Sequence, residues 1–214
     1  MSFETIRKNI QEKNKITPTT SFADLVKTKA EVVGDKVYLT FVRDFDKGID
    51  ETYTYRDMYL QSNRVANALL KAGLKRGDGL SLYQINSPEF LFILFGAWKI
   101  GIYVVLVNTG LKGDGLQYII DHSDSKVLGT HWSLLDNCLN IKEQLPKIEH
   151  VIVDMNEAPE DFKLPGRIIS LQKFMDVSDE DTNVKIDPND MATLIYTSGT
   201  TGLPKATTFF HRGM

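Results

Sequence analysis

The sequence predicts an α/β fold, in which a largely parallel sheet carries helices on both faces. From Leu80 onward, short runs of β-branched and aromatic residues alternate with stretches of helical length. Such alternation is typical of parallel sheets, because two neighbouring parallel strands need a crossover connection, usually a helix, between them. The composition agrees, since 214 residues with 42% hydrophobic and 25% charged side chains suit an ordinary soluble chain with one large core.

The first part of the chain is predicted to hold an arm, a helix and a hairpin. Residues 1–20 show no sustained periodicity and are expected to form an N-terminal arm. A helix follows over residues 21–33, with Ser21 as its N-cap. Two β-rich runs, 36–42 and 51–55, flank a turn that contains Asp and Gly, and we expect them to pair as a hairpin.

A second helix is predicted from Thr54 to Gly73. Asp57 lies three residues after Thr54, which makes a variant of the capping box, and Gly73 stands where helices commonly end. Later strands are predicted over residues 80–85, 103–107, 126–130, 150–155, 191–197 and 206–210. The helices between them are predicted over residues 88–99, 114–124, 132–145 and 171–175.

One segment, residues 90–107, is apolar enough over eighteen residues to be a candidate membrane span. Lys99 in its middle and a Ser-Pro start signal before it oppose that interpretation. We therefore predict a buried helix over residues 88–99, which Gly101 ends, and an interior strand over residues 103–107. Peripheral membrane contact stays an open alternative.

Residues 156–188 differ from the rest of the chain because they are acidic and polar and contain several prolines. We expect a surface excursion with a short helix near residues 171–175, the nearest equivalent of a linker in this chain. No function is assigned to it.

Charge and metal-ligand residues exclude several classes of function. The formal net charge is −3 and the pI about 5.8, so we expect no nucleic-acid partner. Cys138 is the only cysteine, which excludes an internal disulfide and, with a polar start that lacks a secretory signal, favours the cytoplasm. The histidines show no ligand spacing, so no metal site is predicted, and His211 is assigned no chemistry.

Near the C-terminus, nine residues hold two glycines, four hydroxyl side chains and a lysine, between two predicted strands. Glycines let backbone N–H groups face an anion, and Ser and Thr hydroxyls donate further hydrogen bonds, so a polyphosphate is the expected ligand. The Walker pattern fails, because Lys205 lies three residues past Gly202 and no helix follows. A G-x-G-x-x-G fingerprint is also absent.

The string "YTSGTTGLPK", residues 196–205, resembles the phosphate-binding signature of the adenylate-forming (AMP-binding) superfamily, which includes acyl-CoA synthetases. Residues 53–101 also resemble the N-terminal region of that superfamily. Residues 107–128, and Ala206 in place of the more common glycine, are similar to the branch of fatty acid transport proteins and very-long-chain acyl-CoA synthetases.

The resemblance implies a ligase that uses ATP, Mg²⁺ and coenzyme A. A carboxylic acid, expected to be a fatty acid, would be activated as an acyl-adenylate and then transferred to the thiol of coenzyme A. The residues implied to bind the β- and γ-phosphates are Thr197, Ser198, Gly199, Thr200, Thr201, Gly202 and Lys205.

The resemblance also implies that residues 21–214 form only the N-terminal part of the large domain, without the small C-terminal domain. On that interpretation, the chain is expected to be inactive alone and catalysis to need residues beyond Met214. The alternative is a free-standing module that binds a nucleotide or an acyl group without catalysis.

Overall fold

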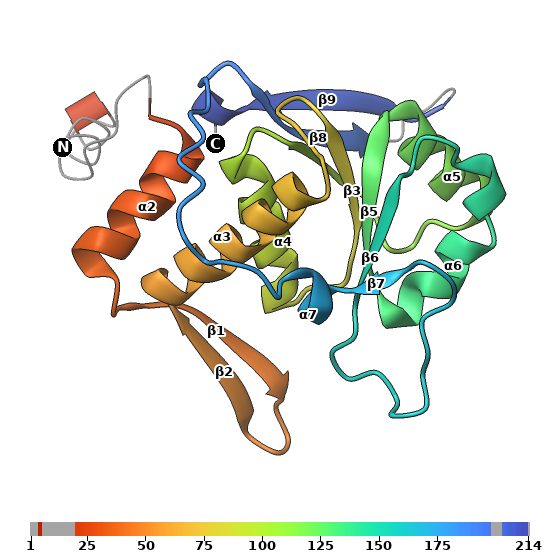
Figure 1. Cartoon of the computed structure of the whole chain (residues 1–214), viewed down its shortest axis with the longest axis horizontal. Helices are drawn as coiled ribbons and strands as arrows, with labels where there is room; N and C mark the ends of the chain where they lie inside the picture. The colour runs from red at the N-terminus through yellow and green to blue at the C-terminus, as the bar shows by residue number, and fades with distance from the viewer. Residues whose placement is uncertain (1–3, 6–19, 198–202, 214) are drawn as a thin grey trace.

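The computed structural model describes residues 4–5, 20–197 and 203–213, and a seven-stranded sheet lies at its centre (Figure 1). The order of strands across this sheet is β7-β6-β5-β3-β4-β8-β9. Their bounds are β3 Gly79–Tyr83, β4 Tyr103–Leu106, β5 Ser125–His131, β6 His150–Asp154, β7 Ile169–Ser170, β8 Met191–Thr197 and β9 Lys205–Phe210. Every neighbouring pair is parallel except β8 and β9, so the prediction of a largely parallel sheet is confirmed.

Helices cover both faces of the sheet, as predicted. Figure 1 shows α3 (Tyr55–Lys71) and α4 (Pro88–Lys99) on one side, and α5 (Gly113–His122) and α6 (Leu135–Leu139) on the other. Because side chains alternate along a strand, each inner strand supplies both layers. Leu80 and Leu82 of β3 pack in the cluster that holds α3 and α4, whereas Tyr83 packs with α5 and α6.

The N-terminal elements lie as the capping signals predict. Helix α2 (Phe22–Val33) begins after Ser21, whose hydroxyl accepts from the Asp24 backbone N–H. Thr54 and Asp57 form the same reciprocal box at the start of α3, with distances of 3.1 and 2.8 Å. Between these helices, β1 (Val37–Asp44) and β2 (Ile49–Thr54) pair antiparallel as a hairpin that projects from the helices (Figure 1).

The apolar segment of residues 90–107 forms two elements, as predicted. Helix α4 ends at Lys99, and Gly101 adopts a φ of 71°, a left-handed conformation that suits glycine at a helix end. Strand β4 follows in the interior of the sheet. Within the part of the chain that the structure describes, no helix is both long and apolar enough to cross a membrane.

Two details near β6 differ from the predictions. The single helix predicted over residues 132–145 is wrong: a short 3₁₀ turn, helix α6 and another 3₁₀ turn replace it. Asn140, a weak helix former, ends α6, and the Trp132 indole donates outside the helix to the Asn156 carbonyl at 2.9 Å. Strand β7 was not predicted, because its two residues are too few to show a period.

The acidic segment of residues 156–188 is tied firmly to the helices. It contains the short helix α7 (Leu171–Phe174), which confirms the predicted helix near residues 171–175. Further along, the Asp181 carboxylate accepts from the Tyr59 hydroxyl at 2.7 Å and pairs with Lys27 at 2.8 Å and Lys99 at 3.4 Å. Lys99 is only 5% exposed, so Asp181 compensates a charge that is held away from water.

Gly96 lets α4 pack closely against α3, because a Cβ there would lie 2.5 Å from the Val65 Cβ. We expect Gly96→Ala to lower the free energy of unfolding by about 1–3 kcal/mol, despite the better helix propensity of alanine. The control is Gly115→Ala in α5, where the nearest atom would be 3.6 Å away and a gain of about 0.5 kcal/mol is expected. Urea unfolding measures both, and equal stability of the two variants would contradict this account of the packing.

Asp181 gives a second prediction, with a pH dependence. Burial alone would raise the pKa of Asp181, but the hydrogen bonds from Lys27, the Asn183 backbone and Tyr59 outweigh burial and hold this pKa below its usual range. Its stabilising contribution is therefore fully present at neutral pH and is lost as the pH falls from about 4 through the lower pKa of the folded state.

We expect Asp181→Asn to cost about 3 kcal/mol at pH 7, because Lys99 would remain buried without its counter-charge. The control is Asp179→Asn, whose carboxylate is 40% exposed and pairs with Arg64 at 3.1 Å, a pair worth about 0–1 kcal/mol. Unfolding curves from pH 7 to pH 2 should show the Asp181 variant and the unmodified chain converging in acid. A constant difference between them would contradict the assignment.

Candidate functional site

The glycine- and hydroxyl-rich loop connects β8 and β9, so the predicted strand–loop–strand arrangement is confirmed at both ends. In the antiparallel ladder Tyr196 lies opposite Ala206, and Thr197 lies opposite Lys205. Because β8 is parallel to β4, Thr197 stands at the carboxyl end of the parallel strands. Ligands of open α/β sheets commonly bind beyond that edge.

Two of the seven predicted site residues can be placed in the structure. Thr197 and Lys205 are both exposed, and they face each other as the last pair of the ladder. The other five predicted residues lie outside the described residues: Ser198, Gly199, Thr200, Thr201 and Gly202. The structure therefore brings a hydroxyl and an ammonium group together at the two ends of the loop, Thr197 and Lys205, which are called the feet of the loop below.

Helix α5 contacts the residue before each foot of the loop, a feature that the sequence did not reveal. The Nδ1 atom of His122 lies 2.8 Å from the Tyr196 hydroxyl, one residue before Thr197. The Tyr118 hydroxyl donates to the Pro204 carbonyl at 3.4 Å, one residue before Lys205. The four-residue spacing of Tyr118 and His122 on a helix was the only signal that the two rings share a face.

The first half of β8 is held by α4, which lies on the other face of the sheet from α5. The indole N–H of Trp98 in α4 donates to the Ala192 carbonyl at 2.7 Å. The His211 ring packs edge-on against Trp98 with centroids 6.4 Å apart, and burial lowers the pKa of His211. His211 is 2% exposed, and neither ring nitrogen has a hydrogen-bond partner among the described residues.

Metal-ligating side chains do not gather anywhere in the described part of the chain. No group of three or more His, Cys, Asp or Glu side chains there could hold a metal ion. His122 contacts Tyr196, and His131 contacts Ser133 and the Asn156 carbonyl, so these two histidines have other partners.

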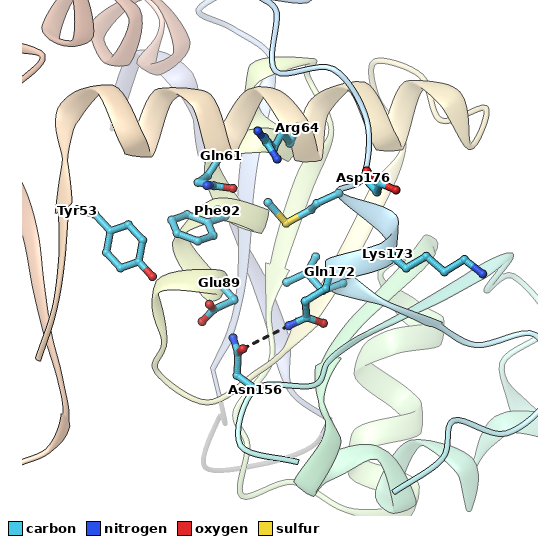
Figure 2. Close-up of a pocket in the computed structure, with 11 residues that line it drawn as sticks. Tyr53, Gln61, Arg64, Glu89, Phe92, Asn156, Gln172, Lys173 and Asp176 are labelled. Atoms are coloured by element: carbon cyan, nitrogen blue, oxygen red, sulfur yellow. Dashed lines mark hydrogen bonds between the residues drawn. The ribbon is translucent and has the colours of Figure 1, made fainter. Parts of the chain in front are cut away.

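A second concave region lies between α3, the start of α4 and α7 (Figure 2). This pocket has a volume of about 540 Å³, and neither Thr197 nor Lys205 is among its lining residues. Its lining is mixed in polarity, and the labelled side chains in Figure 2 are Tyr53, Gln61, Arg64, Glu89, Phe92, Asn156, Gln172, Lys173 and Asp176. Nothing in the sequence indicates this pocket, because its lining residues are far apart along the chain.

Glu89 is the most buried charged group in this pocket. It is 8% exposed, and burial raises its pKa. Its Oε2 atom has no hydrogen bond among the described residues, and the nearest cation is the Arg43 guanidinium at 3.5 Å. Since Arg43 also pairs with Glu51 at 2.8 Å, the carboxylate of Glu89 is only partly compensated.

The comparisons with known proteins agree with this geometry. A model of the family described as "AMP-binding enzyme" matches residues 26–214. The chain is 35% identical over 163 residues to long-chain fatty acid transport protein 6 of Mus musculus, a match that covers 73% of this chain and 25% of that protein. It is also 35% identical over 168 residues to 4-hydroxybutyrate–CoA ligase 2 of Metallosphaera sedula, covering 77% and 30%.

Among solved structures, the anthranilate CoA ligase AuaEII in complex with anthranoyl-AMP superposes with a TM-score of 0.80 and 26% identity, covering 92% of this chain and 36% of that one. The chain thus spans about a quarter to a third of the length of these relatives. The fold and the family match extend over almost all of it. By sequence and by fold, this chain belongs to the family of AMP-binding enzymes.

Proposed function

We propose that this chain forms the N-terminal part of an ATP-dependent acyl-CoA synthetase, and that its β8–β9 loop binds the triphosphate of ATP. The carrying observation is the pairing of Thr197 with Lys205 at the carboxyl edge of the sheet, which sets the two ends of the signature side by side. The family match to AMP-binding enzymes and the share of the relatives' length that the chain covers support the same proposal.

The chemistry of the loop suits the first step of the proposed reaction. A carboxylate attacks the α-phosphate of ATP, the bond to the bridging oxygen breaks, and pyrophosphate leaves with the negative charge. Backbone N–H groups and hydroxyls of residues 197–202, with the Lys205 ammonium, would offset that charge without reorganising. Mg²⁺ bound to the nucleotide would neutralise part of it.

The second proposed step transfers the acyl group from AMP to the thiol of coenzyme A. We propose a fatty acid as the carboxylic acid, on the resemblance of residues 107–128 and Ala206 to the fatty acid transport branch and on the match to a protein of that name. A reducing, cytoplasmic setting belongs to the same proposal, because the single cysteine, Cys138, is a buried free thiol.

The proposal predicts acid-dependent exchange of pyrophosphate into ATP by the full-length protein that contains this chain. We expect Lys205→Ala and Gly199→Ala each to reduce the exchange rate at least about 100-fold, as is typical when a donor to developing charge is lost or its backbone displaced. The matched control is Lys163→Ala, which removes another exposed lysine far along the chain from the loop. Exchange by this control should be unchanged.

Two results would contradict the proposal. Wild-type exchange rates in both loop variants would show that the loop does not bind the leaving group. Exchange at a normal rate by the 214-residue chain alone would contradict its being only part of the catalytic unit, whereas ATP binding without any exchange in the full-length protein would favour a binding module.

A further inference from the structure

Three aromatic side chains form a bracket next to the two ends of the β8–β9 loop: Tyr118 and His122 of α5, and Tyr196 of β8. The Tyr118 and His122 rings lie 5.1 Å apart between centroids at 34°, and the His122 and Tyr196 rings lie 5.8 Å apart at 84°. The ring contacts accompany the 2.8 Å hydrogen bond between His122 Nδ1 and the Tyr196 hydroxyl. Two residues of the bracket come from a helix and one from a strand 74 positions away.

The bracket touches both chain segments that meet at the loop. Tyr196 immediately precedes Thr197, and the Tyr118 hydroxyl donates to the carbonyl of Pro204, which immediately precedes Lys205. A shift of either foot would therefore break a contact with the same helix. Thr197 and Lys205 are themselves exposed, and the bracket holds the residue that precedes each of them.

Helix α5 is a fixed base for these contacts. Its inner face buries Leu116, Ile119 and Ile120 in the cluster on that side of the sheet. The side chains at positions 118 and 122 are one helical turn apart and stand together at the edge of that face. The helix cannot rotate to follow the loop without exposing its buried residues.

We infer that His122 is a positioning residue for ATP binding, which holds Tyr196 and, together with Tyr118, fixes the distance between the two feet of the loop. This inference rests on the proposed function of the loop. His122 acts through Tyr196 and does not touch the nucleotide, so its loss should weaken ATP binding more than it slows the chemical step.

The Tyr196 phenol keeps its proton at neutral pH, because burial raises its pKa to about 12. In the His122 tautomer that carries its proton on Nε2, Nδ1 accepts from this phenol, and in the other tautomer the donor and acceptor roles exchange. A ring without a nitrogen at this position removes the hydrogen-bond partner of the phenol while keeping the contact with Tyr118.

A double-mutant cycle in the full-length protein tests the inference, with pyrophosphate exchange measured over a range of ATP concentrations. His122→Phe keeps the ring and removes Nδ1, whereas Tyr196→Phe keeps the ring and removes the hydroxyl. Each change is expected to raise the KM for ATP about five-fold with kcat within about two-fold, the effect of one hydrogen bond. The double variant should be no worse than either single variant, because both remove the same bond.

His122→Asn is the conservative variant, since its side-chain amide reaches the place of Nδ1, and it should recover most of the ATP affinity. Rescue by Asn but not by Phe separates a hydrogen-bond role from ring packing. An unchanged KM for ATP in His122→Phe, or additive effects in the double variant, would overturn the inference.

The same exchange assay also tests the proposed function of the loop, through the variant Lys205→Ala. If Lys205→Ala abolishes exchange while His122→Phe leaves the KM for ATP unchanged, the positioning role fails and the proposed function stands. If the unmodified full-length protein shows no exchange, the proposed function fails and the inference about His122 fails with it.

Discussion

The position of the candidate site depends on one pairing, the parallel alignment of β8 beside β4. Val104, Val105 and Leu106 pair with Thr193, Leu194 and Ile195, although nearly ninety residues separate them in the chain. This pairing sets where β8 ends and therefore where the loop begins. A slip of one residue would reverse the faces of Leu194 and Thr193 and move both feet of the loop.

The register is held along the whole of β8 by contacts outside the ladder. Trp98 donates to the Ala192 carbonyl at the start of the strand, and His122 contacts the Tyr196 hydroxyl at its end. Before the strand, Asp190 accepts from the Arg76 guanidinium at 2.6 Å and fixes the turn into β8. Helices from both faces of the sheet thus act on one strand, which gives the exposed Thr197 at its end a defined position.

Sequence reasoning succeeded where the information is local. The capping boxes at Ser21 and Thr54 involve residues three positions apart, and the break between α4 and β4 coincides with the positive φ of Gly101. The loop signature is likewise continuous, so its place between two strands could be predicted. Each of these features is set by neighbours along the chain.

Reasoning from sequence failed where a distant partner decides the outcome. Asp181 looked like one acid of a polar surface segment, yet its partners come from three helices. Residues 132–145 have a helical pattern, but Trp132 bonds to a carbonyl beyond β6 and the helix breaks into short turns. The bracket could not be predicted for the same reason, because the partners of Tyr118 and His122 lie 86 and 74 positions further along the chain, in and just before the strands at the loop ends.

Helix α4 is almost entirely buried and yet has a charged residue at each end, and the two charges differ in how well they are paired. Glu89 lies in its first turn and Lys99 in its last, so both charges complement the helix dipole. Lys99 also has Asp181 and the Tyr59 ring, 4.1 Å from its ammonium group, and its charge is enclosed by partners.

Glu89 has no comparable enclosure. Its carboxylate lies in the pocket of Figure 2, shares Arg43 with Glu51, and leaves one oxygen without a hydrogen bond among the described residues. Burial of a poorly paired carboxylate opposes folding, so packing alone does not account for a glutamate at this position. The helix dipole and Arg43 reduce the cost of burying Glu89 without removing it, so this residue lowers the stability of the fold.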